Sequence, residues 1–364
     1  MQMTKKTIAL IVLIAAGVAA LIGGGIYAYH KSQEPKSIPE QTEEAEDTED
    51  TSAKSRLTGL PIDESKVNLR PIAIMTENTK SALPQYGLNE AGVIYECPVE
   101  GGITRLMCIF DDLGTLEKIG NVRSCRPYYA YIASEFDAIY VHYGQSVQGQ
   151  EVLDRGIVND LNGLDGSVSE KVFYRTSDKK APHNAYTSAA GVAAGIAEKG
   201  YDTNYASDYT THYLFSQDEN TLSSGSDCYA LSLYYSNNHP YFIYDSSAGL
   251  YKRYQFSDAQ TDAVDGEQAA VKNIILQNVP SSIYSGTQYL DIPLTGSGEG
   301  KYITNGKMID ILWSKDSDTA VTHYYDADGN EIEINPGNTW VSLIENASAS
   351  KNVFYATESD YENR

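Results

Sequence analysis

The fold is decided by the stretch Glu100-Gly101-Gly102-Ile103-Thr104-Arg105, an apolar run to Phe110 and, after a turn, Val122-Arg123-Ser124-Cys125-Arg126. The apolar run predicts a strand in the centre of a sheet. Three arginines frame this strand, in a chain whose formal net charge is -22. A guanidinium group is a permanently charged planar fork that suits carboxylate or phosphate. We therefore predict that these arginines gather in one anion-binding site.

The framing arginines have two alternative roles. They are Arg105, Arg123 and Arg126. A helix that begins at Pro127 would add its free backbone N–H groups to an anion site. Alternatively, each arginine forms a structural ion pair with a carboxylate at a strand end. The carboxylates nearest in sequence are Glu100, Asp111 and Asp112.

Strands and helices alternate on both sides of this stretch. The predicted strands are Pro71–Asn78, Gly92–Cys97, Thr104–Phe110, Asp137–Tyr143 and Val172–Arg175. The predicted helices are Pro127–Phe136, Val147–Leu153 and Tyr186–Lys199. This alternation predicts an α/β domain with a mixed sheet over residues 57–204. Ligands of such sheets bind at the carboxyl ends of strands.

The second half of the chain has a different pattern. Tyr229–Tyr235 and Tyr241–Asp245 flank a turn at Asn237-Asn238, and further turns are expected at Asn305-Gly306 and Asp328-Gly329. Short alternating segments around such turns are typical of β-hairpins. We predict a mainly antiparallel β (α+β) domain over residues 205–364.

The N-terminal residues predict a membrane attachment. Lys5-Lys6 precedes an uncharged stretch from Thr7 to Tyr29, which is long enough to cross a bilayer as one helix. A cleaved signal peptide is the alternative, but Ala28-Tyr29-His30 is a poor cleavage site. We favour a single-span anchor over residues 1–30 with the globular part extracytoplasmic. Residues 31–56, which include the acidic run Glu43–Asp50, predict a disordered tether.

Charge and cysteine spacing exclude several classes of function. The negative charge argues against nucleic-acid binding, which needs a basic face. The four cysteines lack CxxC spacing, so no zinc site is expected; they are Cys97, Cys108, Cys125 and Cys228. Cys97 and Cys108 could form a disulfide, although buried free thiols are favoured. We expect a turn rather than a calcium site at Asp326–Glu331, and no motif predicts a cofactor.

Two histidines and a serine are candidates for catalysis. His142 lies at the end of the best predicted strand, and Ser146 follows it closely. Ser146 could be a nucleophile with His142 or His183 as its base, but it lacks the Gly-x-Ser-x-Gly elbow. Ser146 would equally serve as a helix N-cap, with His142 as a structural residue. Glu100 is a further acid/base candidate.

A polar loop supplies the remaining candidates. Arg175 precedes it, and Pro182-His183-Asn184 ends it. Arg175, His183 and Lys180 extend the cationic groups available to an anion, and Asn184 stands beside them. The structural alternative is that Asn184 caps the helix expected from Tyr186.

Several of these motifs together resemble a known family. They are Gly120–Arg126, Asp137–Ser146, Ala181–Asn184, Asn305–Trp313, Tyr325–Asn330 and Asn335–Trp340. The chain resembles the YerB-like family of envelope lipoproteins, whose domains have no known function. The resemblance covers nearly everything after residue 57 and implies an extracytoplasmic, membrane-tethered protein of Gram-positive-type bacteria. One feature departs from the family name, because no cysteine follows the apolar stretch to accept a lipid.

The sequence favours one function over two alternatives. The favoured function is binding of an anionic envelope ligand, a phosphorylated cell-wall precursor or glycopolymer, through the arginines. The first alternative is an envelope hydrolase or transferase that uses His142, His183 or Glu100 as acid/base. The second is a scaffold that assembles envelope proteins without a small ligand.

Overall fold

The computed structural model describes residues 52–364. The predicted anchor at 1–30 and all but the last five residues of the predicted tether lie outside the described residues. Within residues 52–364, no helix combines the length and the apolar character needed to cross a membrane. Ser55, which lies within the predicted tether, donates a hydrogen bond from its hydroxyl to Asp111, at 2.7 Å.

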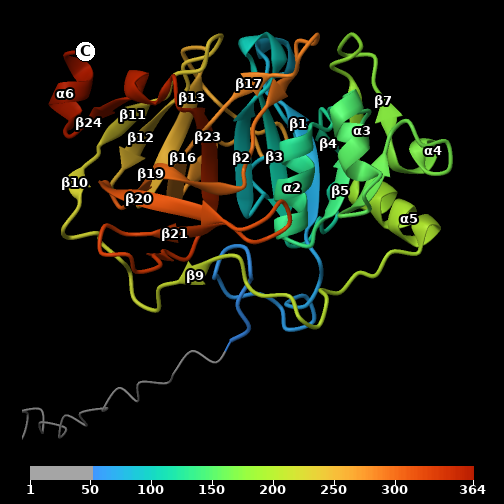
Figure 1. Cartoon of the computed structure of the whole chain (residues 1–364), viewed down its shortest axis with the longest axis horizontal. Coiled ribbons are helices and arrows are strands. Elements are labelled where there is room, and N and C mark those ends of the chain that lie inside the picture. The colour runs from blue at the N-terminus through green and yellow to red at the C-terminus, as the bar shows by residue number, and fades with distance from the viewer. Residues whose placement is uncertain (1–51) are drawn as a thin grey trace, which may run out of the picture. The chain divides into compact units, whose positions relative to one another are not determined.

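The predicted central strand forms the middle of a mixed sheet (Figure 1). This strand, β3 (Thr104–Phe110), is buried along its whole length and pairs antiparallel with β1 (Ile72–Glu77) and β2 (Val93–Pro98). β5 (Ile139–His142) runs parallel to β1, and β6 (Asn159–Asn162) runs parallel to β5. The predicted α/β character of the first half is therefore confirmed.

Two helices follow the capping signals in the sequence. α2 (Pro127–Glu135) has proline in its first turn, where a missing N–H costs nothing. α3 (Val147–Leu153) has Ser146 as its N-cap, whose side chain accepts a hydrogen bond from the N–H of Gly149. Of its two predicted roles, nucleophile and helix N-cap, Ser146 therefore has the structural one, the N-cap.

The helix predicted over Tyr186–Lys199 begins later than expected. A short strand, β8 (Ala185–Thr187), precedes the helix α5 (Ala189–Lys199), and Ser188 is the N-cap instead of Asn184. β8 pairs with both β4 (Ile119–Gly120) and β7 (Tyr174–Arg175), so tertiary pairing overrides local helix preference. The strand predicted from Val172 is shorter for a related reason, since Val172 ends the short helix α4 (Ser169–Val172).

The second half is mainly antiparallel, as predicted. β19 (Gly296–Thr304) and β20 (Lys307–Lys315) form a hairpin around Asn305-Gly306, and both turn residues have positive φ. Such a turn matches the twist of the paired strands. β11 (Ala230–Ser232) and β12 (Tyr241–Asp245) form the hairpin predicted around Asn237-Asn238.

The remaining elements are short or extend these sheets. They are β9 (Leu214–Phe215), β10 (Ser226–Asp227), β13 (Leu250–Gln255), β14 (Asp258–Ala259), β15 (Ala270–Val271), β16 (Asn273–Val279), β17 (Ser282–Ile283), β18 (Leu290–Asp291), β21 (His323–Tyr325), β22 (Glu333–Ile334), β24 (Val353–Tyr355) and α6 (Glu358–Glu362). Single 3-10 turns occur at Lys80–Ala82, Glu100–Gly102 and Ala349–Lys351. β11 to β15 and β24 make a second sheet of six strands.

One strand joins the two halves of the chain. β23 (Thr339–Glu345) lies between β16 and β2 and is parallel to both. The main sheet, of eleven strands, therefore contains residues from both predicted domains. The predicted boundary at residues 204 and 205 stays a prediction.

The core has two layers, one on each face of the main sheet. Met107 and Ile109 of β3 pack on the side of α2, together with Tyr129. Leu106 and Cys108 alternate with them and pack on the side of the second sheet. Among the described residues all four cysteines are free and buried, as favoured from the sequence. Cys97 and Cys108 belong to different layers, so they do not form a disulfide.

Candidate anion-binding site

The predicted arginine stretch lies where two parallel strands end. The N–H of Arg123 bonds to the carbonyl of Met75 in β1, and the carbonyl of Arg123 accepts from Tyr143 beyond β5. The N–H of Cys125 bonds to the carbonyl of Gly144. The backbone of residues 122–125 is thus fixed across the carboxyl ends of β1 and β5, where α/β sheets bind ligands.

Arg105 and Arg126 share one carboxylate. Arg126 bonds to Glu100 through Nε, at 2.9 Å, and through a second, very short contact. Arg105 lies 3.7 Å from the same carboxylate and donates a bond of 2.6 Å to the carbonyl of Ser124. The side chains of Arg105 and Arg126 are only 4% and 6% exposed. These two arginines therefore hold the site together more than they offer charge to solvent.

The charges around Glu100 shift several pKa values. Burial alone would raise the pKa of the Glu100 carboxyl, but the hydrogen bond from Arg126 and the charge of Arg105 bring it below its ordinary value. Burial lowers the pKa of Arg105, and the neighbouring charges of Arg126 and Arg123 add to this effect. Arg105 and Arg126 therefore meet at Glu100, and the charge of Arg123 also acts on the pKa of Arg105.

Arg123 and His183 share a second carboxylate, which sequence reasoning missed. Glu77, the last residue of β1, lies 2.8 Å from Nδ1 of His183 and 3.4 Å from Nε of Arg123. Glu77 is buried and also accepts a bond of 2.9 Å from the hydroxyl of Thr79. The side chains of Arg123 and His183 remain 18% and 28% exposed, so both can meet a ligand.

Asn121 is the second residue that sequence reasoning missed. Its amide nitrogen donates to the hydroxyl of Tyr186, at 2.7 Å, and to the carbonyl of His183. Its side-chain oxygen is buried and lacks a hydrogen-bond partner. The Nε atom of Arg123 is also buried and makes no hydrogen bond, only the ion pair with Glu77. Buried polar atoms usually have partners. The side-chain oxygen of Asn121 is therefore an acceptor that no described residue satisfies.

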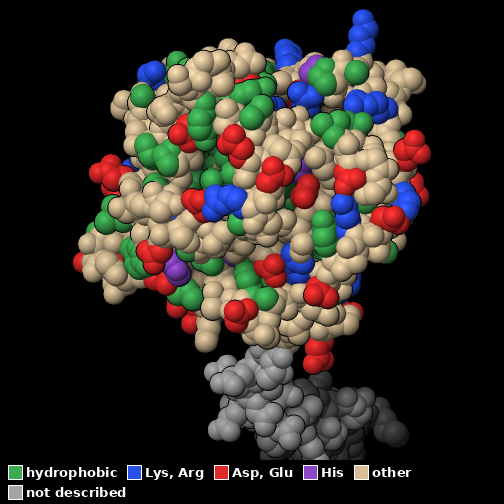
Figure 2. Space-filling model, turned by 45° about the vertical axis from the view of Figure 1, so that its right-hand side comes forward, with side chains coloured by type: hydrophobic (Ala, Val, Ile, Leu, Met, Phe, Trp, Pro, Cys, Tyr) green, Lys and Arg blue, Asp and Glu red, His purple; other side chains and the backbone are tan. Residues whose placement is uncertain are grey.

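Arg175 and Asn184 stand beside this site as a pair. Arg175 donates a bond of 2.8 Å to Asn184 and lies over the ring of Tyr143, 4.6 Å from its centre. Arg175 ends β7 and Asn184 precedes β8, so the pair closes the loop that also carries Lys179 and Lys180. On the face of the molecule drawn in Figure 2, several Lys and Arg side chains lie near a His side chain at the top.

The charges of this site do not cancel. Three guanidinium groups face two carboxylates, which leaves one positive charge in excess before Arg175 and the lysines of the loop are counted. We call Arg105, Arg123, Arg126, Glu77, Glu100, Asn121 and His183 the arginine site. Asp111 and Asp112, offered above as possible partners of the arginines, instead bind Ser55 and Lys66.

Two catalytic candidates do not join the arginine site. His142 is fully buried, and its ring nitrogens bond to Asp160, at 3.0 Å, and to the carbonyl of Gly144, at 2.9 Å. Both nitrogens are therefore occupied. The hydroxyl of Ser146 accepts the cap bond of α3. The described contacts thus give His142 and Ser146 structural roles.

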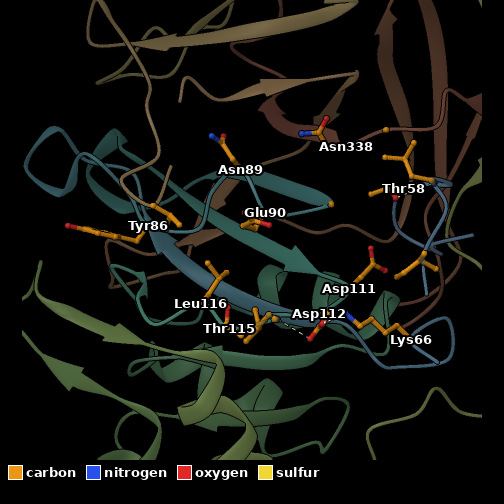
Figure 3. A pocket seen from close by; sticks show the side chains of 18 of the residues that line it. Thr58, Lys66, Tyr86, Asn89, Glu90, Asp111, Asp112, Thr115, Leu116 and Asn338 are labelled. Carbon is orange, nitrogen blue, oxygen red and sulfur yellow. Dashed lines mark hydrogen bonds and ion pairs between the residues drawn. The ribbon is translucent and has the colours of Figure 1, made fainter. Parts of the chain in front are cut away.

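The largest of the described hollows shares no lining residue with the arginine site. It encloses about 1140 Å³ and is lined by Tyr86, Asn89, Glu90, Asp111, Asp112 and residues of both halves (Figure 3). Glu100 lines a smaller pocket of about 200 Å³ beside Tyr235. We take the arginine site as the primary candidate, because its guanidinium groups outnumber its carboxylates and because Arg123 and His183 remain partly exposed. Among the described residues, no cluster of His, Cys, Asp and Glu could hold a metal ion.

Comparison with known proteins gives a consistent result. Residues 57–202 match the family described as "Protein of unknown function (DUF3048) N-terminal domain", and residues 231–341 match its C-terminal domain. The chain is 30% identical over 301 residues to "Putative lipoprotein YerB" of Bacillus subtilis (strain 168), which covers 82% of this chain and 88% of that protein. The crystal structure of YerB protein from Bacillus subtilis has a TM-score of 0.72 to this structure at 28% identity, and covers 83% of this chain and 99% of that one. The resemblance to YerB-like proteins is thereby confirmed, and the chain belongs to the DUF3048 family of proteins of unknown function.

Proposed function

We propose that this protein binds an anionic ligand of the cell envelope at the arginine site. A phosphorylated cell-wall precursor or glycopolymer is the ligand class that fits it. The observation that carries this proposal is the pairing of Arg123 and His183 on the buried Glu77, with both side chains still accessible. A charged donor that is already oriented loses little freedom when it binds phosphate.

The residues of the site divide into two groups. Arg105 and Arg126 hold Glu100 and the backbone of Ser124 and Cys125, and so fix the shape of the site. Arg123 and His183 would contact the ligand, with the unpaired oxygen of Asn121 accepting a ligand hydroxyl. Arg175 would add long-range attraction for an anion in a chain that is otherwise strongly acidic.

The location that we propose is the outer face of the cell membrane. The relative from Bacillus subtilis is described as a lipoprotein. The stretch from Thr7 to Tyr29 would hold the protein as a single-span anchor, and residues 31–56 would act as the tether. Labelling of intact cells with a reagent that cannot cross the membrane would modify exposed lysines if the globular part lies outside.

A thermal-shift experiment with the full-length protein tests ligand binding. Pyrophosphate at about 100 times its dissociation constant should stabilise the protein by about 2.7 kcal/mol, and so raise its melting temperature. Arg123→Ala should abolish that rise. Arg155→Ala is the matched control, because Arg155 is exposed and pairs with Asp318 and Tyr131, outside the site.

One contact favours enzymatic activity as a second candidate. Glu77 holds Nδ1 of His183, so Nε2 is left without a partner among the described residues. A carboxylate that orients a histidine in this way is a common arrangement for acid/base catalysis. A hydrolase or transferase would lose turnover in His183→Gln while pyrophosphate still binds.

The scaffold alternative predicts a different set of results. Neither pyrophosphate nor wall-type glycans would shift the melting temperature. The full-length protein would instead bind another envelope protein with an affinity that Arg123→Ala leaves unchanged.

A further inference from the structure

A long groove adjoins the arginine site and has a different chemical character. It is the hollow of about 1140 Å³ shown in Figure 3, and we call it the long groove. Its walls come from the first half of the chain, including Thr58 and Asp111, and from the second half, including Lys272 and Asn338. The labelled side chains surround the hollow, with Tyr86 toward one end and Lys66 with Asp112 toward the other (Figure 3). A hollow of about 1140 Å³ is larger than most sites for a single small molecule, and so it suits a longer ligand.

The long groove has no spare positive charge. Four carboxylates line it, those of Glu90, Asp111, Asp112 and Glu117. Its three lysines are all paired: Lys66 with Asp112, Lys118 with Asp178, and Lys272 with Glu219. Two of these partners, Asp178 and Glu219, do not line the groove and neutralise its lysines from outside. A ligand with negative charges along its whole length would therefore be repelled here.

Two carboxylates in the long groove are free to bind hydroxyl groups. Among the described residues, the side chains of Glu90 and Glu117 make no hydrogen bond or ion pair within the protein. Carboxylates accept hydrogen bonds from hydroxyl donors, and bonds to charged acceptors are the stronger ones. The part of a ligand that lies here should be uncharged and rich in hydroxyls, as a glycan is.

Two lysines connect the long groove with the arginine site. Lys118 lines the groove, lies over the rings of Tyr86 and Tyr186 at 4.0 and 4.1 Å, and pairs with the loop between β7 and β8. Tyr186 in turn bonds to Asn121 of the arginine site. Burial lowers the pKa of Lys179, which belongs to the same loop. The charges of Lys118 and Glu77 also act on this pKa, so Lys179 lies near both groups. A ligand leaving the arginine site on this side would thus meet the groove.

We propose that the long groove is a second subsite, which takes the uncharged glycan part of a ligand whose terminal phosphate or pyrophosphate binds at the arginine site. The proposal rests on the proposed function and narrows its ligand class. It selects a glycan with its negative charge at one end over a polymer with phosphates in every repeat. The excess positive charge belongs to the arginine site, whereas unpaired carboxylates line the long groove.

Calorimetric titration of the full-length protein tests this inference with four probes. They are pyrophosphate, an N-acetylglucosamine tetrasaccharide with one terminal phosphate, the same tetrasaccharide without phosphate, and linear polyphosphate. The phosphorylated tetrasaccharide should bind at least about tenfold more tightly than pyrophosphate, since the groove adds contacts. Polyphosphate should gain nothing over pyrophosphate.

Two variants separate the subsites. Thr115 lines the long groove, is exposed and has no side-chain partner among the described residues, so Thr115→Trp should obstruct the groove without disturbing the fold. Thr115→Trp should remove the gain of the phosphorylated tetrasaccharide and leave pyrophosphate binding unchanged, with Thr115→Ser as its control. Arg123→Ala should weaken binding of both ligands.

The outcomes distinguish the two proposals. If pyrophosphate binds but the tetrasaccharide adds no affinity, or if Thr115→Trp leaves the gain intact, the groove subsite is refuted while anion binding stands. Tighter binding of polyphosphate than of the phosphorylated tetrasaccharide would also overturn the inference. If pyrophosphate does not bind at all, the proposed function fails and the groove subsite falls with it.

Discussion

Glu100 links two buried guanidinium groups, and its replacement should be costly. The side chains of Arg105 and Arg126 both contact it and have little exposure to water. Removing one partner of a buried ion pair leaves charge without compensation, which destabilises proteins by about 3–5 kcal/mol. Since Glu100 is partly exposed, we expect Glu100→Gln to lower the free energy of unfolding by about 3 kcal/mol at neutral pH, measured by urea denaturation. Glu333→Gln, a change at an exposed carboxylate, is the control.

The destabilisation caused by Glu100→Gln should depend on pH. The pKa of Glu100 is lowered from its ordinary value of 4.5 in the folded protein, because the effects of Arg126 and Arg105 exceed that of burial. Its ionised form therefore adds stability above that value, and this contribution is lost as pH falls through the lowered pKa. The stability difference between wild type and Glu100→Gln should shrink below about pH 4.5. A difference that stays constant down to pH 3 would contradict this assignment.

The cysteine thiols should be unreactive in the folded protein. Burial raises the pKa of Cys108, Cys125 and Cys228 to about 12, and raises that of Cys97 as well. The thiolate is the reactive form, so a thiol that is both buried and protonated does not react. Titration with a disulfide reagent at about pH 8 should modify no cysteine in native protein and four after unfolding in guanidinium chloride. Rapid modification of any one in the native state would contradict the burial described here.

At the scale of single residues, part of the candidate site was predictable from the sequence. The three arginines were found because they are rare cations in an acidic chain, and they frame one strand. Glu77 was missed because it is an ordinary strand residue, and its partner His183 lies more than a hundred positions away. Only the pairing of β1 with the arginine stretch, and of that stretch with β8, brings them together. Asn121 gave no signal, since its role depends on one unsatisfied oxygen.

At the scale of elements, a buried ion pair couples the two sheets. Arg253 of β13 lies 2.8 Å from Glu96 of β2, both side chains are fully buried, and Arg253 stacks on Trp340 of β23 at 4.0 Å. Arg253→Ala should destabilise the protein by about 3–5 kcal/mol, because the charge of Glu96 would be left buried.

The neighbouring residue provides a matched control for this prediction. The side chain of Lys252 is 41% exposed and pairs with Asp245, so Lys252→Ala should cost no more than about 1 kcal/mol. Both values follow from chemical denaturation of the two variants. Equal effects of the two substitutions would show that the Glu96 pair does not couple the sheets.

Elements were predictable where local signals agree with tertiary structure. The hairpin at Asn305-Gly306 and the helix from Pro127 both formed as expected, because turn and cap residues specify them. The segment at Ala185–Thr187 became a strand although alanine-rich sequence favours a helix. Its pairing with two distant strands decided this, and no local pattern announces such a pairing.

At the scale of the whole molecule, the main sheet makes the two halves interdependent. β2, from the first half, has β23 as one of its two neighbours. A fragment of residues 57–204 would leave the buried edge of β2 open, and open apolar edges aggregate. We expect the intact chain to unfold in one cooperative transition, and the fragment to be insoluble or unfolded, as followed by circular dichroism. A soluble fragment with a sharp transition of its own would show that the halves fold independently.

The fold class was predictable from periodicity, whereas the joining strand was not. The apolar run from Trp340 to Ile344 reads as one more strand of the second half. Its continuous burial fits parallel pairing on both sides, but sequence does not name the partners. The position of the long groove relative to the arginine site depends on the pairing of this strand with both halves. It could not be predicted from the sequence either.

Binding of an anion between Arg123 and His183 is the central feature of the proposed function. Calorimetric titration of the full-length protein with pyrophosphate, repeated at about 0.05 and 0.2 M salt, measures this directly. We predict saturable binding at one site that weakens as salt rises, is lost in Arg123→Ala and is retained in Arg155→Ala. No heat of binding to the wild type, or equal binding by Arg123→Ala, would contradict the central claim.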